Sequence, residues 1–164
     1  MNTTLDKVYV DQPRPLPAIL VGGFIAGLLD LICAFMVFGV RAPRGIAGGL
    51  VGRVAIQGGM GYYVLGIALH FFIACSAAAV YYGASMKLKF LKEYPFVCGL
   101  FYGIAIFLVM NLIVLPLSAI HFKGPFTMHG LDQGLLVHMF LIGLPIAYSV
   151  RIFSKGKRSS RTAA

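Results

Sequence analysis

Four strongly polar side chains stand apart within long apolar runs of this sequence: Asp30, His70, Asn111 and His138. A carboxylate, two imidazoles and a carboxamide can carry protons, hydrogen-bond a small solute or ligate a metal. A charged group inside a membrane costs about 2.5–3.5 kcal/mol on insertion scales, so such groups usually face the protein interior and mark function. We therefore take these four residues as candidates for binding a ligand or a proton.

The apolar runs around them are long enough to cross a membrane. The 164 residues are 59% hydrophobic and 12% charged, whereas soluble domains are about 45–50% apolar and about 25% charged. A helix needs about 20 residues to cross the hydrocarbon core. The sequence predicts spans at about 17–40, 62–84, 95–119 and 132–153, between a cytoplasmic N-terminal segment, 1–16, and a basic cytoplasmic tail, 154–164.

A glycine-rich segment, RAPRGIAGGLVGRVAIQGGMG, lies between the first two spans and is too short to cross. Ile46, Leu50 and Val54 recur at every fourth position and would form an apolar row on a helix. This pattern predicts a short interfacial or re-entrant helix. The predicted fold is an all-α, integral membrane four-helix bundle that carries this additional helix between spans 1 and 2.

Small residues at a spacing of four predict close contacts between the spans. The pairs are Gly23 with Gly27, Ala74 with Ala78, and Gly99 with Gly103. They predict a compact bundle in the lipid bilayer and are compatible with a homo-oligomer or a membrane-complex partner. The formal net charge of +9 does not indicate nucleic-acid binding, because the charges lie in short stretches between apolar runs, where Lys and Arg meet anionic lipid.

The positively charged residues also predict the orientation. With both termini in the cytoplasm, most of the 14 Lys and Arg residues are on the inside. The outer set is then Arg41, Arg44, Arg53 and Lys123, of which Arg41 and Arg44 are interpreted as anchors at the end of the first span.

In this orientation the four polar residues lie at similar depths. At 1.5 Å per residue, Asp30, His70, Asn111 and His138 are roughly 15, 12, 12 and 9 Å below the outer ends of their spans. They would form one polar layer in the outer half of the bundle.

Three interpretations of this layer remain open. The four groups could hydrogen-bond across helices and fix the register of the bundle. They could instead form a protonatable or small-solute site that opens outward. Finally, His70 and His138 could ligate a b-type haem, or a divalent metal, although no cofactor is expected from the spacing itself.

Four further residues could form a vestibule above the layer: Arg53, His121, His129 and Asp132. Arg53 could approach Asp30 and neutralise it, or it could extend to the lipid headgroups. Asp132 could act in the vestibule, or it could interact with the dipole at the start of the fourth span. The loop histidines would gain charge in acid in either case.

No catalytic motif accompanies these residues. The sequence contains no G-x-S-x-G, no Walker loop, no H-E-x-x-H and no acidic pair within a span. Cys33, Cys75 and Cys98 have no metal-binding spacing and are interpreted as small buried hydrophobes. We therefore expect a non-enzymatic protein, with an electron-transfer subunit or a structural subunit of a membrane complex as alternatives.

Three stretches, LGIALHFFIACSAAAVYYGAS, YGIAIFLVMNLIVLPLSAI and HMFLIGLPIAYSVR, give this chain a family resemblance. It resembles a group of small uncharacterised bacterial inner-membrane proteins in its LG-x-x-x-HF, MN-x-x-V-x-PLS and H-x-x-x-x-GLPIA patterns. More distantly, its ending is similar to the YagU-like inner-membrane family, which is associated with acid resistance. The resemblance implies a bacterial inner-membrane location. Beside proton or solute binding, our working function includes support of envelope or acid-stress homeostasis.

Overall fold

The computed structural model describes residues 9–11, 14–121, 128–154 and 158–160, with backbone alone at 9–11, 128–129 and 158–160. Four helices in this part of the chain are long and apolar enough to cross a membrane: Pro15–Val51, Met60–Lys87, Pro95–Leu117 and Gly130–Ser154. The predicted all-α, four-helix membrane fold is therefore confirmed. The predicted 1–16 and 154–164 segments lie largely outside the described residues.

The spans are divided by local changes of helix type. The elements in order are β1 (Tyr9–Asp11), α1 (Pro15–Phe38), η1 (Gly39–Arg41), α2 (Ala42–Val51), η2 (Arg53–Ala55), α3 (Met60–Lys87), α4 (Phe90–Glu93), α5 (Pro95–Val109), η3 (Met110–Val114), α6 (Leu115–Leu117), α7 (Met128–Val137), η4 (His138–Gly143), α8 (Leu144–Ser154) and β2 (Arg158–Ser160). Here η1 and η2 are 3-10 turns, whereas η3 and η4 are π-helical. Strands β1 and β2 pair antiparallel.

Prolines and glycines set the helix boundaries. Pro15 and Pro95 lie in the first turns of α1 and α5, where the missing N–H has no intrahelical partner to lose. Gly39 and Gly52 have φ angles of 64° and 86°, a conformation that L side chains rarely adopt. These two glycines therefore end α1 and α2.

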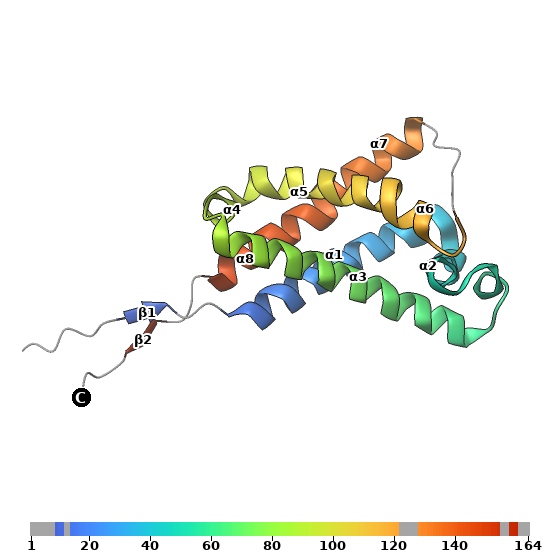
Figure 1. Ribbon diagram of the computed structural model, residues 1–164, viewed down its shortest axis with the longest axis horizontal. Helices are drawn as coiled ribbons and strands as arrows, with labels where there is room; N and C mark the ends of the chain where they lie inside the picture. Colours follow the sequence, from blue (N-terminus) through green and yellow to red (C-terminus); the bar gives the residue numbers. More distant parts are fainter. Residues whose placement is uncertain (1–8, 12–13, 122–127, 155–157, 161–164) are drawn as a thin grey trace, which may run out of the picture.

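Helix α1 packs against both α3 and α8, and α5 packs against η4 and α8 (Figure 1). The backbone N–H of Arg14 donates to the carbonyl of Phe153 over 3.2 Å, so the start of α1 and the end of α8 are neighbours. We call this the termini end of the bundle, and we call the opposite end, where α2 lies, the α2 end. There the N–H of Ala119 donates to the carbonyl of Gly49 over 2.8 Å.

Glycines make the helix contacts close, as their spacing predicts. A Cβ atom at Gly23 would lie 2.6 Å from the Cα of Cys75 on α3. A Cβ at Gly103 would collide with the carbonyl oxygen of His138 and lie 2.5 Å from the Cα of Met139. The α1–α3 and α5–η4 interfaces therefore bring backbone against backbone, the main source of helix association in lipid.

The predicted short helix between the first two spans is present as α2. Leu50 and Val54 are 58% and 59% exposed, and the helix ends at Val51, so Val54 does not continue its apolar row. The buried residues are instead small or compact: Ala42, Pro43, Ala47 and Gly48. Small side chains let α2 approach α3 closely, and Gly66 of α3 lies directly against the carbonyl of Pro43.

The bundle has a modest core and an apolar exterior. Its largest fully buried side chains include Tyr81, Ile146 and Val150. Many large apolar side chains point outward, among them Met36 at 79% and Leu117 at 77% exposure. A soluble monomer does not present so much apolar surface, whereas a lipid-embedded one must. The apolar outer face of the bundle is consistent with contact to lipid acyl chains.

Candidate functional site

The structure brings Asp30 and His70 together across the α1–α3 interface. The Nε2 atom of His70 lies 3.9 Å from Oδ2 of Asp30, with side chains 12% and 24% exposed, respectively. The same Nε2 lies 2.8 Å from the carbonyl oxygen of Gly27. One half of the predicted polar layer is therefore a contact pair from two neighbouring spans.

The hydrogen bond to Gly27 defines the tautomer of His70. A carbonyl oxygen can only accept, so Nε2 carries the hydrogen and donates it. The 3.9 Å separation from Asp30 exceeds hydrogen-bond distance but suits an ion pair when the imidazole is protonated. Nδ1 makes no hydrogen bond to the described residues and is the nitrogen that can accept a second proton.

Small residues and aromatic rings position this pair. A Cβ on Gly27 would lie 3.0 Å from both the Cβ of Ala74 and a ring carbon of Phe71, so α1 needs glycine here to place its carbonyl within reach of His70. The Phe71 ring stacks on Phe24 with centroids 5.1 Å apart and meets the His70 ring edge-on at 5.7 Å. Backbone approach and aromatic packing together fix the imidazole between the two spans.

Asn111 and His138 form a second group, connected through Phe107. The Asn111 amide donates to the carbonyl of Phe107 over 2.8 Å, and the His138 ring meets the Phe107 ring edge-on at 5.5 Å. His138 Nδ1 donates to the carbonyl of Gly134 over 2.8 Å. Among the described residues, no hydrogen bond or ion pair joins this group to the Asp30–His70 pair.

Asn111 and His138 share a local reason for being polar. Each lies at or next to the start of a π-helical segment, and each donates to the carbonyl four residues earlier. The carbonyl of Phe107 also accepts the backbone N–H of Met110, so the Asn111 amide is an additional donor to it. In both cases the side-chain hydrogen bond stays within its own helix and does not reach a neighbouring span.

In the described part of the chain, three of the predicted vestibule residues, Arg53, His121 and Asp132, form no hydrogen bond or ion pair with either group. Arg53 is exposed on η2, and it makes no ion pair with Asp30 in the described part of the chain. His121 is exposed, has a φ angle of 50° and places Nδ1 3.4 Å from the carbonyl of Pro116. Asp132 is exposed on α7, and the side chain of His129 lies outside the described residues.

Sequence reasoning missed several polar contacts of arginine and tyrosine. The hydroxyls of Tyr81 and Tyr102 donate to the carbonyls of Leu91 and Ala77, over 2.9 and 2.7 Å, and the two rings meet with centroids 4.9 Å apart. Tyrosines within a span were the available signal, because a buried hydroxyl needs a partner. The missed arginine, Arg44, had been interpreted as an anchor, but it packs on an aromatic ring at the α2 end.

The described residues contain no group of three or more His, Cys, Asp or Glu side chains placed to hold a metal ion. Ligation of haem by His70 and His138 stays a hypothesis. Comparisons of this chain with family models, with curated proteins and with solved structures find no match. The likeness to the YagU-like family is therefore still an expectation from the sequence, and the chemistry of the polar residues has to support any functional proposal.

Proposed function

We propose that this chain is a non-enzymatic, multi-pass protein of the bacterial inner membrane in which the Asp30–His70 pair binds and transfers a proton or hydrogen-bonds a small solute. The observation that supports this most directly is the 3.9 Å approach of a carboxylate to an imidazole from two adjacent spans. Both side chains are partly exposed, His70 to 12% and Asp30 to 24%. Paired ionisable residues in membrane segments mark proton and solute pathways.

The proposed chemistry uses the two nitrogens of His70 differently. Nε2 keeps its hydrogen and its bond to Gly27, which holds the ring in place. Nδ1 accepts the incoming proton, and the Asp30 carboxylate stabilises the resulting imidazolium. Release of that proton from Nδ1 restores the neutral ring without breaking the bond to Gly27.

In the proposed orientation both termini are cytoplasmic and the α2 end faces outward. The pair then lies in the outer half of the membrane, on the side exposed to acid outside the cell. Histidine is the side chain that most readily changes charge near neutral pH. A role in acid-stress or envelope homeostasis, the second part of our working function, fits such a pair.

A proton-flux assay in proteoliposomes tests this proposal. Vesicles carrying the full chain and an internal pH-sensitive dye receive an external acid pulse, and the rate of internal acidification is followed. His70→Gln is the sharpest variant, because its amide retains a donor for Gly27 but cannot take up a proton. Asp30→Asn removes the charge partner, and His121→Gln is the matched control on an exposed histidine.

We expect faster acidification with the wild-type chain than with empty vesicles, and rates near the empty-vesicle value for His70→Gln and Asp30→Asn. His121→Gln is expected to behave as wild type. Wild-type vesicles no faster than empty ones, or a His70→Gln rate equal to wild type, contradict proton transfer by this pair. Thermal unfolding of each variant in detergent shows that any loss of rate occurs in folded protein.

A further inference from the structure

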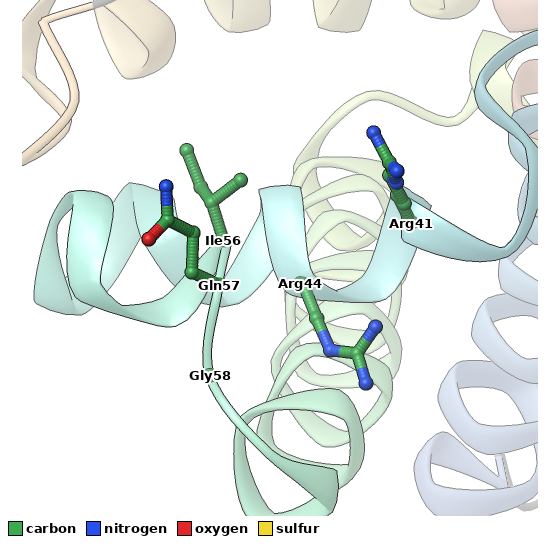
Figure 2. Close-up of a pocket in the computed structure, with 5 residues that line it drawn as sticks. All are labelled: Arg41, Arg44, Ile56, Gln57 and Gly58. Atoms are coloured by element: carbon green, nitrogen blue, oxygen red, sulfur yellow. The ribbon is translucent and has the colours of Figure 1, made fainter.

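A cavity of about 470 Å³ lies at the α2 end, lined by Arg41, Arg44, Ile56, Gln57 and Gly58. Figure 2 shows Arg41 and Arg44 extending from the start of α2 and the turn before it, on different sides of the ribbon. Ile56 and Gln57 belong to the connection that leads through Gly58 into α3. The lining therefore combines two guanidinium groups, a carboxamide and an apolar side chain.

No described residue neutralises the positive charge of this cavity. In the described part of the chain, neither Arg41 nor Arg44 forms an ion pair or a hydrogen bond through its side chain. The Nε atom of Arg44 is buried and has no hydrogen-bond partner there. The guanidinium carbon of Arg44 lies 5.7 Å from the centroid of the Tyr63 ring, so a cation–π contact holds the group in place and leaves its charge available.

The surroundings of the cavity are those of a membrane interface. Val40 and Val54, on either side of α2, are 72% and 59% exposed, and Ile56 in the lining is 40% exposed. Tyr62 and Tyr63 lie at the start of α3, and tyrosine is enriched where a span leaves the hydrocarbon. One part of a ligand in this cavity would therefore contact the guanidinium groups, and another part would contact apolar side chains.

We propose that this cavity binds the phosphate-bearing headgroup of an anionic phospholipid. Guanidinium groups match the geometry of phosphate oxygens, and the exposed apolar side chains beside them provide contact for the acyl chains. A lipid explains the site better than free phosphate, because apolar side chains, Ile56 in the lining and Val40 and Val54 nearby, are exposed beside the arginines. The divergent arginines in Figure 2 also favour an extended headgroup over a compact anion.

Native mass spectrometry of the purified full chain in a neutral detergent tests the assignment. Phosphatidylglycerol is titrated against phosphatidylcholine with identical acyl chains, and inorganic phosphate is added as a competitor in a separate arm. The variants are Arg44→Gln and Arg41→Gln. Arg53→Gln is the matched control, since Arg53 is exposed at the same end but does not line the cavity.

We expect preferential binding of phosphatidylglycerol, weakened about fivefold by either Arg44→Gln or Arg41→Gln, from about 1 kcal/mol per arginine near a lipid surface. Arg53→Gln is expected to change the affinity less than about twofold. Arg44→Gln removes the contact with Tyr63 and could unfold the chain. Arg41 is exposed, so Arg41→Gln tests the proposal in folded protein even in that case.

Three results overturn the proposal. Equal affinity for the two lipids shows that no anionic group is recognised. Equal losses in Arg53→Gln and Arg41→Gln show diffuse attraction instead of a site. Displacement of phosphatidylglycerol by inorganic phosphate assigns the cavity to a soluble anion and not to a lipid. Because this site is separate from His70, its test stands independently of proton flux.

Discussion

Replacing Gly23 by alanine tests whether the close approach of α1 and α3 creates the Asp30–His70 site. The added Cβ would lie 2.6 Å from the Cα of Cys75 and 2.8 Å from its Sγ, whereas ordinary van der Waals separation begins at 3.4 Å. The Cα belongs to the backbone and cannot rotate away. The two helices therefore have to separate at this level, by about 0.8 Å if only the overlap with this backbone atom is relieved.

This separation has a direct consequence one turn further along α1. Gly27 accepts the His70 hydrogen bond at 2.8 Å, and widening by the same amount gives about 3.6 Å, which is no longer a hydrogen bond. Overpacking costs about 1–3 kcal/mol, and a lost interhelical bond costs about 0.6 kcal/mol. The better helix propensity of alanine returns about 0.8–1 kcal/mol, so we expect a net loss of about 1–3 kcal/mol.

Unfolding by sodium dodecyl sulfate in mixed micelles measures the difference in the free energy of unfolding. The proteoliposome assay measures the rate of internal acidification after an acid pulse, which reports on the Asp30–His70 pair. Gly83→Ala is the matched control, because Gly83 is on α3 and has no atom within 4 Å of an added Cβ. It is expected to keep or slightly raise the free energy of unfolding and to leave proton flux unchanged. If Gly23→Ala is as stable as Gly83→Ala and transfers protons at the wild-type rate, helix proximity does not form the site.

Two further predictions concern α2 and the haem hypothesis. Gly66→Ala places a Cβ against the carbonyl of Pro43 and is expected to displace α2 from α3. The displacement should lower the free energy of unfolding by about 1–3 kcal/mol and weaken the binding of phosphatidylglycerol. An unchanged affinity for this lipid would contradict the idea that α2, packed on α3, forms a wall of the cavity. If His70 and His138 ligate a b-type haem, chain purified after haem supply shows a Soret band, and His70→Gln and His138→Gln each shift or weaken it by removing one axial ligand; a spectrum without that band excludes the haem.

The amino-acid sequence predicts the spans well, because membrane insertion depends on summed hydrophobicity over about 20 residues. It also predicts close helix contacts, because glycines such as Gly23 and Gly103 allow a neighbouring backbone to approach whenever their side of the helix faces another helix. What it cannot supply is that rotation. Depth alone put Asp30, His70, Asn111 and His138 in one layer, and depth is insensitive to the direction in which each side chain points.

Local backbone geometry accounts for much of what depth missed. Asn111 and His138 turn to carbonyls of their own helices at π-helical segments, and hydrophobic periodicity carries no signal for a π-turn. Arg44 reaches Tyr63 because small residues let α2 lie on α3, a contact that an amphipathic pattern built on Leu50 and Val54 does not reveal. The interpretation of Arg44 as an ordinary anchor did not include this partner.

The same physical cause underlies both proposed sites. In lipid, apolar side chains gain little by leaving acyl chains for one another, so helices associate where backbones can approach. Gly27 brings a carbonyl to His70, and Gly66 brings α3 to Pro43 at the base of α2. Each close approach leaves an ionisable side chain, His70 or Arg44, at the edge of the interface with part of its hydrogen-bonding capacity unused. In both proposed sites, a chain rich in glycine and poor in charge holds an ionisable side chain beside a close helix contact.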